Sequence, residues 1–153
     1  MRLVVLLLCV GCWVTPLAAQ DHASVALPAT LDRILREYER GWRAGAADSL
    51  ASLFAVDGFA LPSGRAAARG RSAIEGTYAG AGGDLRLRAL SWSVSDSIGF
   101  IVGAYRFGAV GADIGKFVLA LRRESGGRWL IAADIDNTNA PSRETQPPTS
   151  SGP

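Results

Sequence analysis

Cysteine and histidine are scarce in this chain of 153 residues. Its two cysteines, Cys9 and Cys12, lie in an apolar N-terminal run, and its one histidine is His22. The sequence therefore argues against zinc sites built from His and Cys, and against Ser-His-Asp or Cys-His catalysis. No P-loop or dinucleotide-binding motif is present either. We expect neither a metal nor a cofactor, and chemistry limited to Asp, Glu, Tyr, Arg, Ser or the single lysine, Lys116.

The first 19 residues have the pattern of a secretory signal peptide. Arg2 supplies an early positive charge, residues 3–14 are apolar, and small residues run up to Ala19. The apolar run is shorter than the roughly 20 residues that span a bilayer, so we predict cleavage after Ala19 and no transmembrane segment. The mature protein is then secreted or periplasmic, and it has no cysteine with which to form a disulfide. A lipoprotein anchored through Cys12 is the less favoured alternative.

Charge gives no sign of a nucleic-acid partner. Apart from Arg2, 15 basic residues face 14 acidic ones, whereas a phosphate-binding surface needs a clustered excess of positive charge. Residues 139–153 are rich in Pro, Ser and Thr and are predicted to form a disordered tail. An unstructured leader is expected at residues 20–28, which leaves 29–138 as one domain.

Helical periodicity dominates the first half of this domain. The longest predicted helix ends at Gly45 and has an apolar stripe of period 3.6. Two shorter helices follow, and Thr30, Asp48 and Ser72 are the expected N-caps, the last within a Ser-x-x-Glu capping box. The stripe of the longest helix consists of Leu31, Ile34, Leu35, Tyr38 and Trp42.

From Leu85 onward the apolar period is two, which indicates strands. Irregular alternation near Ala89 suggests a β-bulge. If the last strand alternates without interruption, Trp129 and Asp134 lie on opposite faces of the sheet. We then expect Trp129 to lie on the outer face, at a dimer contact. Helices followed by a strand meander predict an α+β protein. The expected strands are 85–95, 98–107, 114–123 and 128–136.

Three segments, AADSLASLFAVDGFALPSG, GRSAIEGTY and GGRWLIAADIDN, occur in an order that resembles the SnoaL-like proteins of the ketosteroid-isomerase-like superfamily, also called nuclear-transport-factor-like. The resemblance covers 29–138. It implies a cone-shaped α+β barrel, in which three helices pack on a curved, mostly antiparallel sheet around an apolar pocket. It also implies homodimers that form through the sheet.

The steroid-isomerase mechanism does not carry over with this resemblance. The position of its carboxylate base, before the Pro-x-Gly turn, is Leu61, and the position of its second acid is Leu119. Dehydratases that rely on histidine are also a poor match for this composition. The pocket-facing positions of the last strand map instead onto Ala132, Asp134 and Asp136, so two carboxylates are expected to face the cavity.

Asp134, Asp136 and Tyr38 are the candidate catalytic residues. Carboxylates at i and i+2 on a strand lie about 7 Å apart, so in a dry pocket one should have a raised pKa suited to proton transfer, with Tyr38 as hydrogen-bond donor. The alternative is that both aspartates lie in water at a strand end. The candidate pocket residues, which can equally fill the core, are Trp42, Phe54, Tyr78, Trp92, Tyr105, Phe117, Leu119 and Asn137.

Two functions remain open at this point. One is an exported domain that encloses a small apolar or carbonyl-bearing ligand, with proton transfer of the isomerase, cyclase or lyase type. The other is a non-catalytic ligand-binding or dimerisation module, which Leu61 and Leu119 favour. Fold alone does not choose between them, because one fold hosts many activities.

Overall fold

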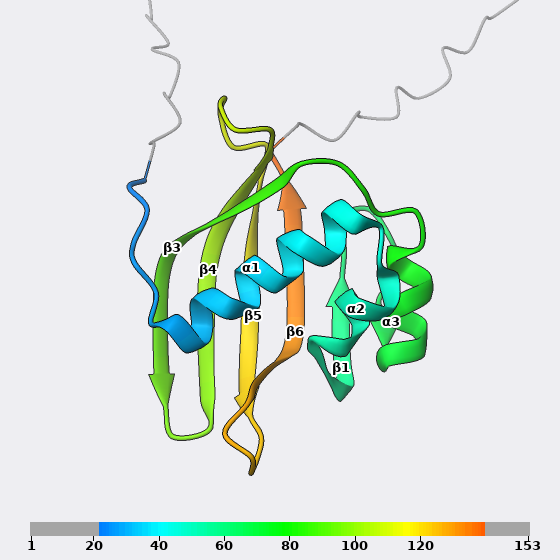
Figure 1. Cartoon of the computed structure of the whole chain (residues 1–153), viewed down its shortest axis with the longest axis vertical. Coiled ribbons are helices and arrows are strands. Elements are labelled where there is room, and N and C mark those ends of the chain that lie inside the picture. The colour runs from blue at the N-terminus through cyan, green and yellow to red at the C-terminus, as the bar shows by residue number, and fades with distance from the viewer. Residues whose placement is uncertain (1–21, 140–153) are drawn as a thin grey trace, which may run out of the picture.

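Three helices and six strands make up residues 22–139, the part of the chain that the computed structural model describes (Figure 1). The predicted signal peptide and residues 140–153 of the predicted tail lie outside this part. The strand ranges expected at 85–95 and 98–107 are confirmed. The elements are α1 (Ala29–Ala44), α2 (Ala47–Ser52), β1 (Phe54–Leu61), β2 (Ala68–Arg69), α3 (Arg71–Tyr78), β3 (Leu85–Ser95), β4 (Ile98–Phe107), β5 (Gly115–Arg123) and β6 (Trp129–Thr138).

The strands form one sheet in the order β2-β1-β6-β5-β4-β3. β1 runs parallel to β6, and every other neighbouring pair is antiparallel. α1 crosses one face of the sheet diagonally, while α2 and α3 lie beside β1 (Figure 1). The predicted fold class, α+β with helices packed on a curved, mostly antiparallel sheet, is therefore confirmed. Within residues 22–139, no helix combines the length and the apolar character that crossing a membrane requires.

The helices start earlier than the capping residues predict. α1 begins after Pro28, whose carbonyl accepts the N–H groups of the first turn, so Thr30 lies inside the helix. α2 begins after Ala46 and α3 after Gly70, again without a side-chain cap. The capping roles expected for Thr30, Asp48 and Ser72 were therefore wrong, because each of these residues lies inside the first turn of its helix and not before it. The predicted C-terminal signal is confirmed: α1 ends at Gly45, in a left-handed conformation with φ of 63°.

Strand β3 forms one side of the sheet, and other parts of the chain cover its outer edge. Glu39 on α1 is only 5% exposed and accepts a hydrogen bond of 2.6 Å from the N–H of Leu87. Arg36 donates to the carbonyl of the same residue at 2.9 Å. Further along, the N–H of Val25 donates to the carbonyl of Ala89 at 2.9 Å. The described part of the expected leader is thus ordered along β3, and α1 is tied to the same strand.

Two β-bulges in the antiparallel strand pairs shape the inner face of the sheet. The predicted one lies between Ala89 and Ser91 in the β3–β4 ladder. A second one, which was not predicted, makes the β5–β6 ladder skip Ala132. It places Trp129 on the same face as Asp134, and Trp129 is 7% exposed and packs in the core. The expected place of Trp129 at a dimer contact was wrong, because alternation was counted without the bulge.

Candidate functional site

An apolar pocket of about 240 Å³ lies between α1 and the inner face of the sheet. Its walls come from α1, from the β4–β5 connection and from all four strands of the meander, and most of its lining is aliphatic or aromatic. Among the described lining residues, the acidic side chains come from β6. The lining residues are Tyr38, Trp42, Leu85, Leu87, Tyr105, Phe107, Ile114, Phe117, Leu119, Asp134, Asp136 and Thr138.

Two tyrosines converge on one carboxylate oxygen at the pocket wall. The hydroxyl of Tyr38 donates to Asp134 Oδ2 at 3.0 Å, and the hydroxyl of Tyr78 lies 3.2 Å from the same oxygen. The two hydroxyl oxygens are 2.9 Å apart. Tyr38 comes from α1, Tyr78 from the last turn of α3 and Asp134 from β6, so the cluster joins three distant parts of the sequence. All three side chains are buried.

Burial sets the protonation of this cluster. It raises the pKa of Asp134 from its ordinary value of 3.8 to about 7, with Asp136 adding to the rise, while the hydrogen bonds from Tyr38 and Tyr78 oppose it. Burial next to Asp134 also raises the pKa of both tyrosines, which remain neutral donors at physiological pH. Near pH 7 the buried carboxyl group therefore exists in both its charged and its neutral form, as a proton-transfer group requires.

The second aspartate has a different environment. Asp136 lines the pocket two residues further along β6, and its Oδ1 accepts a hydrogen bond of 2.6 Å from the backbone N–H of Ser63. Ser63 belongs to the turn that follows β1, so Asp136 fastens this turn to the end of β6. Asp136 thus combines a contact that positions the turn with a negative charge near Asp134.

Aromatic rings form the walls of the pocket, and their positions are fixed by neighbours. Trp42 stacks on Tyr38 at 6.4 Å between ring centroids, and its indole N–H donates to the carbonyl of Gly82 at 2.6 Å. Tyr105 lies over Gly115, its partner on β5, where a Cβ atom would be 2.2 Å from the ring. Only glycine leaves room for this ring, so the sequence at position 115 shapes the pocket.

Several candidate pocket residues lie elsewhere. Phe54 begins β1 in the core and touches the ring of Tyr78 without lining the pocket. Trp92 donates its indole N–H to the carbonyl of Ala26 in the leader. Asn137 is exposed, because it alternates with the inward-facing residues Asp136 and Thr138. Tyr78 does not line the cavity and contributes through its hydroxyl group.

Five lining residues were missing from the candidates taken from the sequence. They occupy β3, the end of β4, the β4–β5 connection and the end of β6, where period-two alternation alone could have found the strand positions. No group of three or more metal-ligating side chains occurs among residues 22–139. The five residues are Leu85, Leu87, Phe107, Ile114 and Thr138.

Several solved structures have a fold similar to that of this chain. The chain is similar to a ketosteroid isomerase-like protein from Erwinia carotovora atroseptica, with 18% identity and a TM-score of 0.61, over 74% of this chain and 96% of that one. It is also similar to a protein of unknown function from Shewanella oneidensis described as NTF-2 like, with 17% identity and a TM-score of 0.58, over 70% and 95% of the two chains. The chain has the NTF2-like fold.

A third structure agrees with this fold. It is a domain of unknown function with a cystatin-like fold from Nostoc punctiforme, with 14% identity and a TM-score of 0.60, over 76% of this chain and 81% of that one. No protein-family model matches the sequence, and no curated protein does. Similarity at these identities establishes the NTF2-like fold and not an activity. Any activity has to be inferred from the residues of the site.

Proposed function

We propose that the protein encloses a small apolar molecule with a carbonyl oxygen and moves a proton on it, with Asp134 as the base. The observation that carries this proposal is the buried carboxyl group of Asp134, whose pKa is raised to about 7 and which accepts hydrogen bonds from two tyrosines at a pocket wall. An ordinary aspartate would be too weak a base at neutral pH, and a pKa near 7 suits proton transfer.

The chemistry follows from the cluster. The carboxylate of Asp134 takes a proton from the carbon next to the carbonyl group, and the C–H electron pair moves to the carbonyl oxygen as an enolate. Protonation of Asp134 weakens its hold on the hydroxyl of Tyr38, which can then donate to the enolate oxygen. Return of the proton to the same carbon or to a conjugated one completes the exchange or isomerisation.

The charges of the lining narrow the choice of ligand. Asp134 and Asp136 are the two carboxylic acids among the described lining residues, which include no lysine or arginine. An anionic ligand would meet these carboxylates in an apolar cavity without a compensating cation, which is costly. A neutral ketone or enone is therefore the preferred class.

Deuterium uptake tests the proposal. The wild-type protein in D₂O should accelerate exchange at the α-carbon of cyclohexanone or 2-cyclohexenone, followed by NMR, with a rate that rises with pH to a plateau above about 7. Asp134→Asn should abolish this acceleration. Asp57→Asn, which removes an exposed carboxylate on β1 that does not line the pocket, is the matched control and should retain it. Equal rates in wild type and Asp134→Asn would reject the role of Asp134.

A non-catalytic binding module is the second candidate. It is favoured by Leu61 and Leu119, which stand where the resemblance to the steroid isomerases expects acids. Native mass spectrometry separates the two functions, since a pure binding module would retain a ligand in wild type and Asp134→Asn alike and would show no deuterium exchange.

We also infer that two copies pair through the outer face of the sheet. Apolar side chains from four adjacent strands are exposed there, where cross-strand pairs such as Val118 with Ile135 face away from the core. Sedimentation should give a dimer for the wild type and a monomer for Val118→Lys. A wild-type monomer at high concentration would dismiss the inference. The strip consists of Phe59, Phe100, Val118 and Ile135.

Export is the remaining part of this proposal. The pattern of residues 1–19 supports secretion or transfer to the periplasm, with release by cleavage after Ala19. Cell fractionation and mass determination of the exported protein test it. A chain that begins at Gln20 agrees with the proposal, whereas a lipid-modified mass at Cys12 would replace it with an anchored form.

A further inference from the structure

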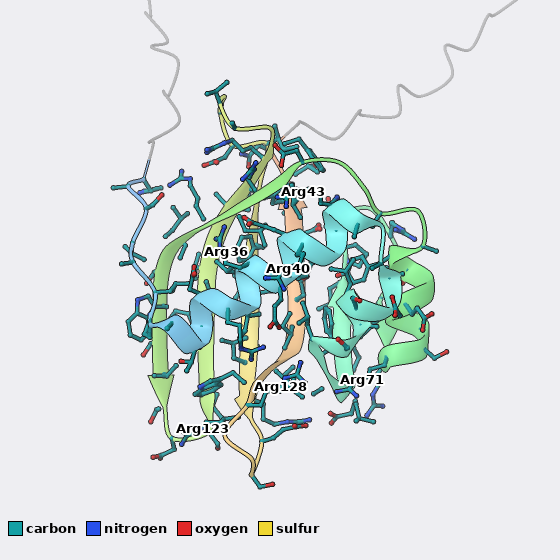
Figure 2. All side chains as sticks on the ribbon, in the orientation of Figure 1. Arg36, Arg40, Arg43, Arg71, Arg123 and Arg128 are labelled. Carbon is teal, nitrogen blue, oxygen red and sulfur yellow. The ribbon has the colours of Figure 1, made fainter. Side chains whose placement is uncertain are left out.

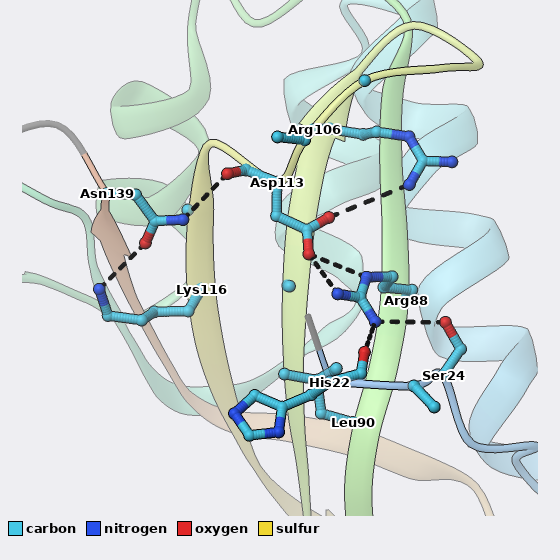
Figure 3. Close-up of a pocket in the computed structure, with 13 residues that line it drawn as sticks. His22, Ser24, Arg88, Leu90, Arg106, Asp113, Lys116 and Asn139 are labelled. Carbon is cyan, nitrogen blue, oxygen red and sulfur yellow. Dashed lines mark hydrogen bonds and ion pairs between the residues drawn. The ribbon is translucent and has the colours of Figure 1, made fainter. Parts of the chain in front are cut away.

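A second pocket, of about 810 Å³, lies on the opposite face of the sheet (Figure 3). Residues of β4 alternate between the two cavities: Tyr105 and Phe107 line the inner one, whereas Ala104 and Arg106 line the outer one. The rest of the outer lining comes from β3, β5, the β4–β5 connection and the start and end of the described chain. The outer pocket is therefore separate from the inner pocket, in which the proton transfer is proposed.

Cationic side chains dominate the outer pocket. Arg88, Arg106 and Lys116 approach from β3, β4 and β5, and Asp113 is the one carboxylate among the described lining residues. Arg88 holds that carboxylate through two of its nitrogens, one of them at 2.9 Å (Figure 3). Asp113 is thus already engaged, and the described lining residues include three cationic side chains and one carboxylate.

The other two cations are weakly held. Arg106 Nη1 lies 4.0 Å from Asp113, Nη2 donates to the carbonyl of Ala109 at 3.1 Å, and the buried Nε has no hydrogen-bond partner among the described residues. A buried donor without an acceptor is costly and marks a place where an acceptor is expected. Lys116 donates to the amide oxygen of Asn139 at 3.1 Å, and no described carboxylate lies within ion-pair distance of it.

The remaining lining suits the non-ionic part of a ligand. Leu90, Ala104 and Ala112 provide apolar surface, while Ser24 and Asn139 carry neutral polar groups. We propose that the outer pocket binds a small organic anion, namely a carboxylate or phosphate ester with an apolar group attached. Arg106 and Lys116 contact the anionic group, and guanidinium and ammonium groups form their strongest hydrogen bonds with such oxygens.

The alternation of β4 makes this site independent of the proposed proton transfer. Opposite charge preferences separate the two pockets: acids line the inner one, and basic residues predominate in the outer one. Loss of either function by mutation on one face should leave the other intact. Asp134→Asn therefore serves as a control for the outer pocket.

An NMR titration of the ¹⁵N-labelled protein tests the proposal, with phenyl phosphate and benzoate as probes and benzyl alcohol as the neutral comparison. Both anions should shift the backbone amides of residues 108–116, and benzyl alcohol should not. Lys116→Met and Arg106→Met should each weaken phenyl phosphate binding about tenfold or more, since each removes a charge-assisted contact. Lys116 is exposed, so its variant should fold normally.

Arg40→Met is the matched charge control, because Arg40 is exposed on α1, on the helical side of the sheet (Figure 2). This variant and Asp134→Asn should bind phenyl phosphate like the wild type. Inorganic phosphate should bind more weakly than phenyl phosphate, because it makes no apolar contacts. The proposal is overturned if neither anion binds, if Arg40→Met loses as much affinity as Lys116→Met, or if inorganic phosphate binds as tightly as phenyl phosphate.

Discussion

The ring of Phe117 on β5 lies over Gly103, its cross-strand partner on β4. A Cβ atom at Gly103 would be 2.1 Å from Phe117 Cζ and 2.6 Å from the carbonyl oxygen of Arg88. Because the ring lines the inner pocket, this glycine fixes both the packing of the sheet and the shape of the cavity.

Gly103→Ala should destabilise the protein, although alanine is normally more favourable than glycine inside a strand. The methyl group displaces the Phe117 ring and meets the backbone of β3, and overpacking of this kind costs about 1–3 kcal/mol. Urea unfolding gives the change in the free energy of unfolding. Gly126→Ala is the control, since nothing lies within 4 Å of a Cβ at that position. A Gly103→Ala protein as stable as the wild type would show that the ring can move freely.

Stability should fall as pH rises from about 4 to about 7. The pKa of Asp134 is higher in the folded state than its ordinary value of 3.8, so in this range the folded state binds a proton that the unfolded state has released. The contribution of this group is about −1.4 kcal/mol per pH unit inside the window and flat outside it. Chemical denaturation of wild type and Asp134→Asn at several pH values isolates it. The difference between the two proteins should change across the window, and a constant difference would contradict the raised pKa.

Tyr38→Phe should raise the pKa of Asp134 further. The hydroxyl of Tyr38 hydrogen-bonds the carboxylate and lowers that pKa, so its removal favours the protonated form. The carboxyl ¹³C chemical shift of Asp134 followed through a pH titration measures the effect. Tyr105→Phe, which removes a hydroxyl from the same pocket without a hydrogen bond to Asp134 among the described contacts, should leave the midpoint close to that of the wild type. The same shift in both variants would mean that the hydrogen bond is not its cause.

Glu39→Ala should destabilise the protein by about 1–3 kcal/mol, because it leaves the half-buried N–H of Leu87 without its acceptor. Hydrogen exchange at the Leu87 amide should accelerate along with the loss of stability. Glu37→Ala removes an acid of the same helix that pairs with Arg33 within one turn at a partly exposed position, so its cost should stay within about 0.5 kcal/mol. Equal losses in the free energy of unfolding for the two variants would show that the hydrogen bond between Glu39 and β3 does not add to stability.

Much of the fold could be read from the sequence, because its periodicities are clear. The stripe of α1 and the bounds of β3 and β4 follow from periods of 3.6 and two, and even the bulge near Ala89 disturbs the alternation visibly. The bulge at Ala132, in contrast, does not disturb the alternation of apolar and polar residues visibly. The run from Trp129 to Ile135 is apolar on both faces apart from Asp134, so a one-residue slip leaves almost no trace in the pattern.

The site was less accessible to sequence reasoning. Asp134 and Tyr38 could be singled out through a family resemblance, but their meeting with the hydroxyl of Tyr78 depends on how α3 packs against α2 and β1. Phe54 and Trp92 are large and aromatic like the true lining residues, and residue type does not tell a core position from a pocket wall. Contacts to backbone groups, such as those of Trp92 with Ala26 and of Asp136 with Ser63, leave no sequence signature.

The covered edge of β3 has a consequence for how this protein behaves when crowded. Open strand edges recruit further strands and are a common start of aggregation. Here Glu39 and Arg36 occupy the peptide groups of Leu87, and Val25 occupies the next carbonyl along the edge. At the other end of the sheet, β2 offers only two residues. Proteolytic trimming past Val25 would leave the carbonyl of Ala89 without this partner, so we expect the trimmed protein to aggregate more readily than the intact one.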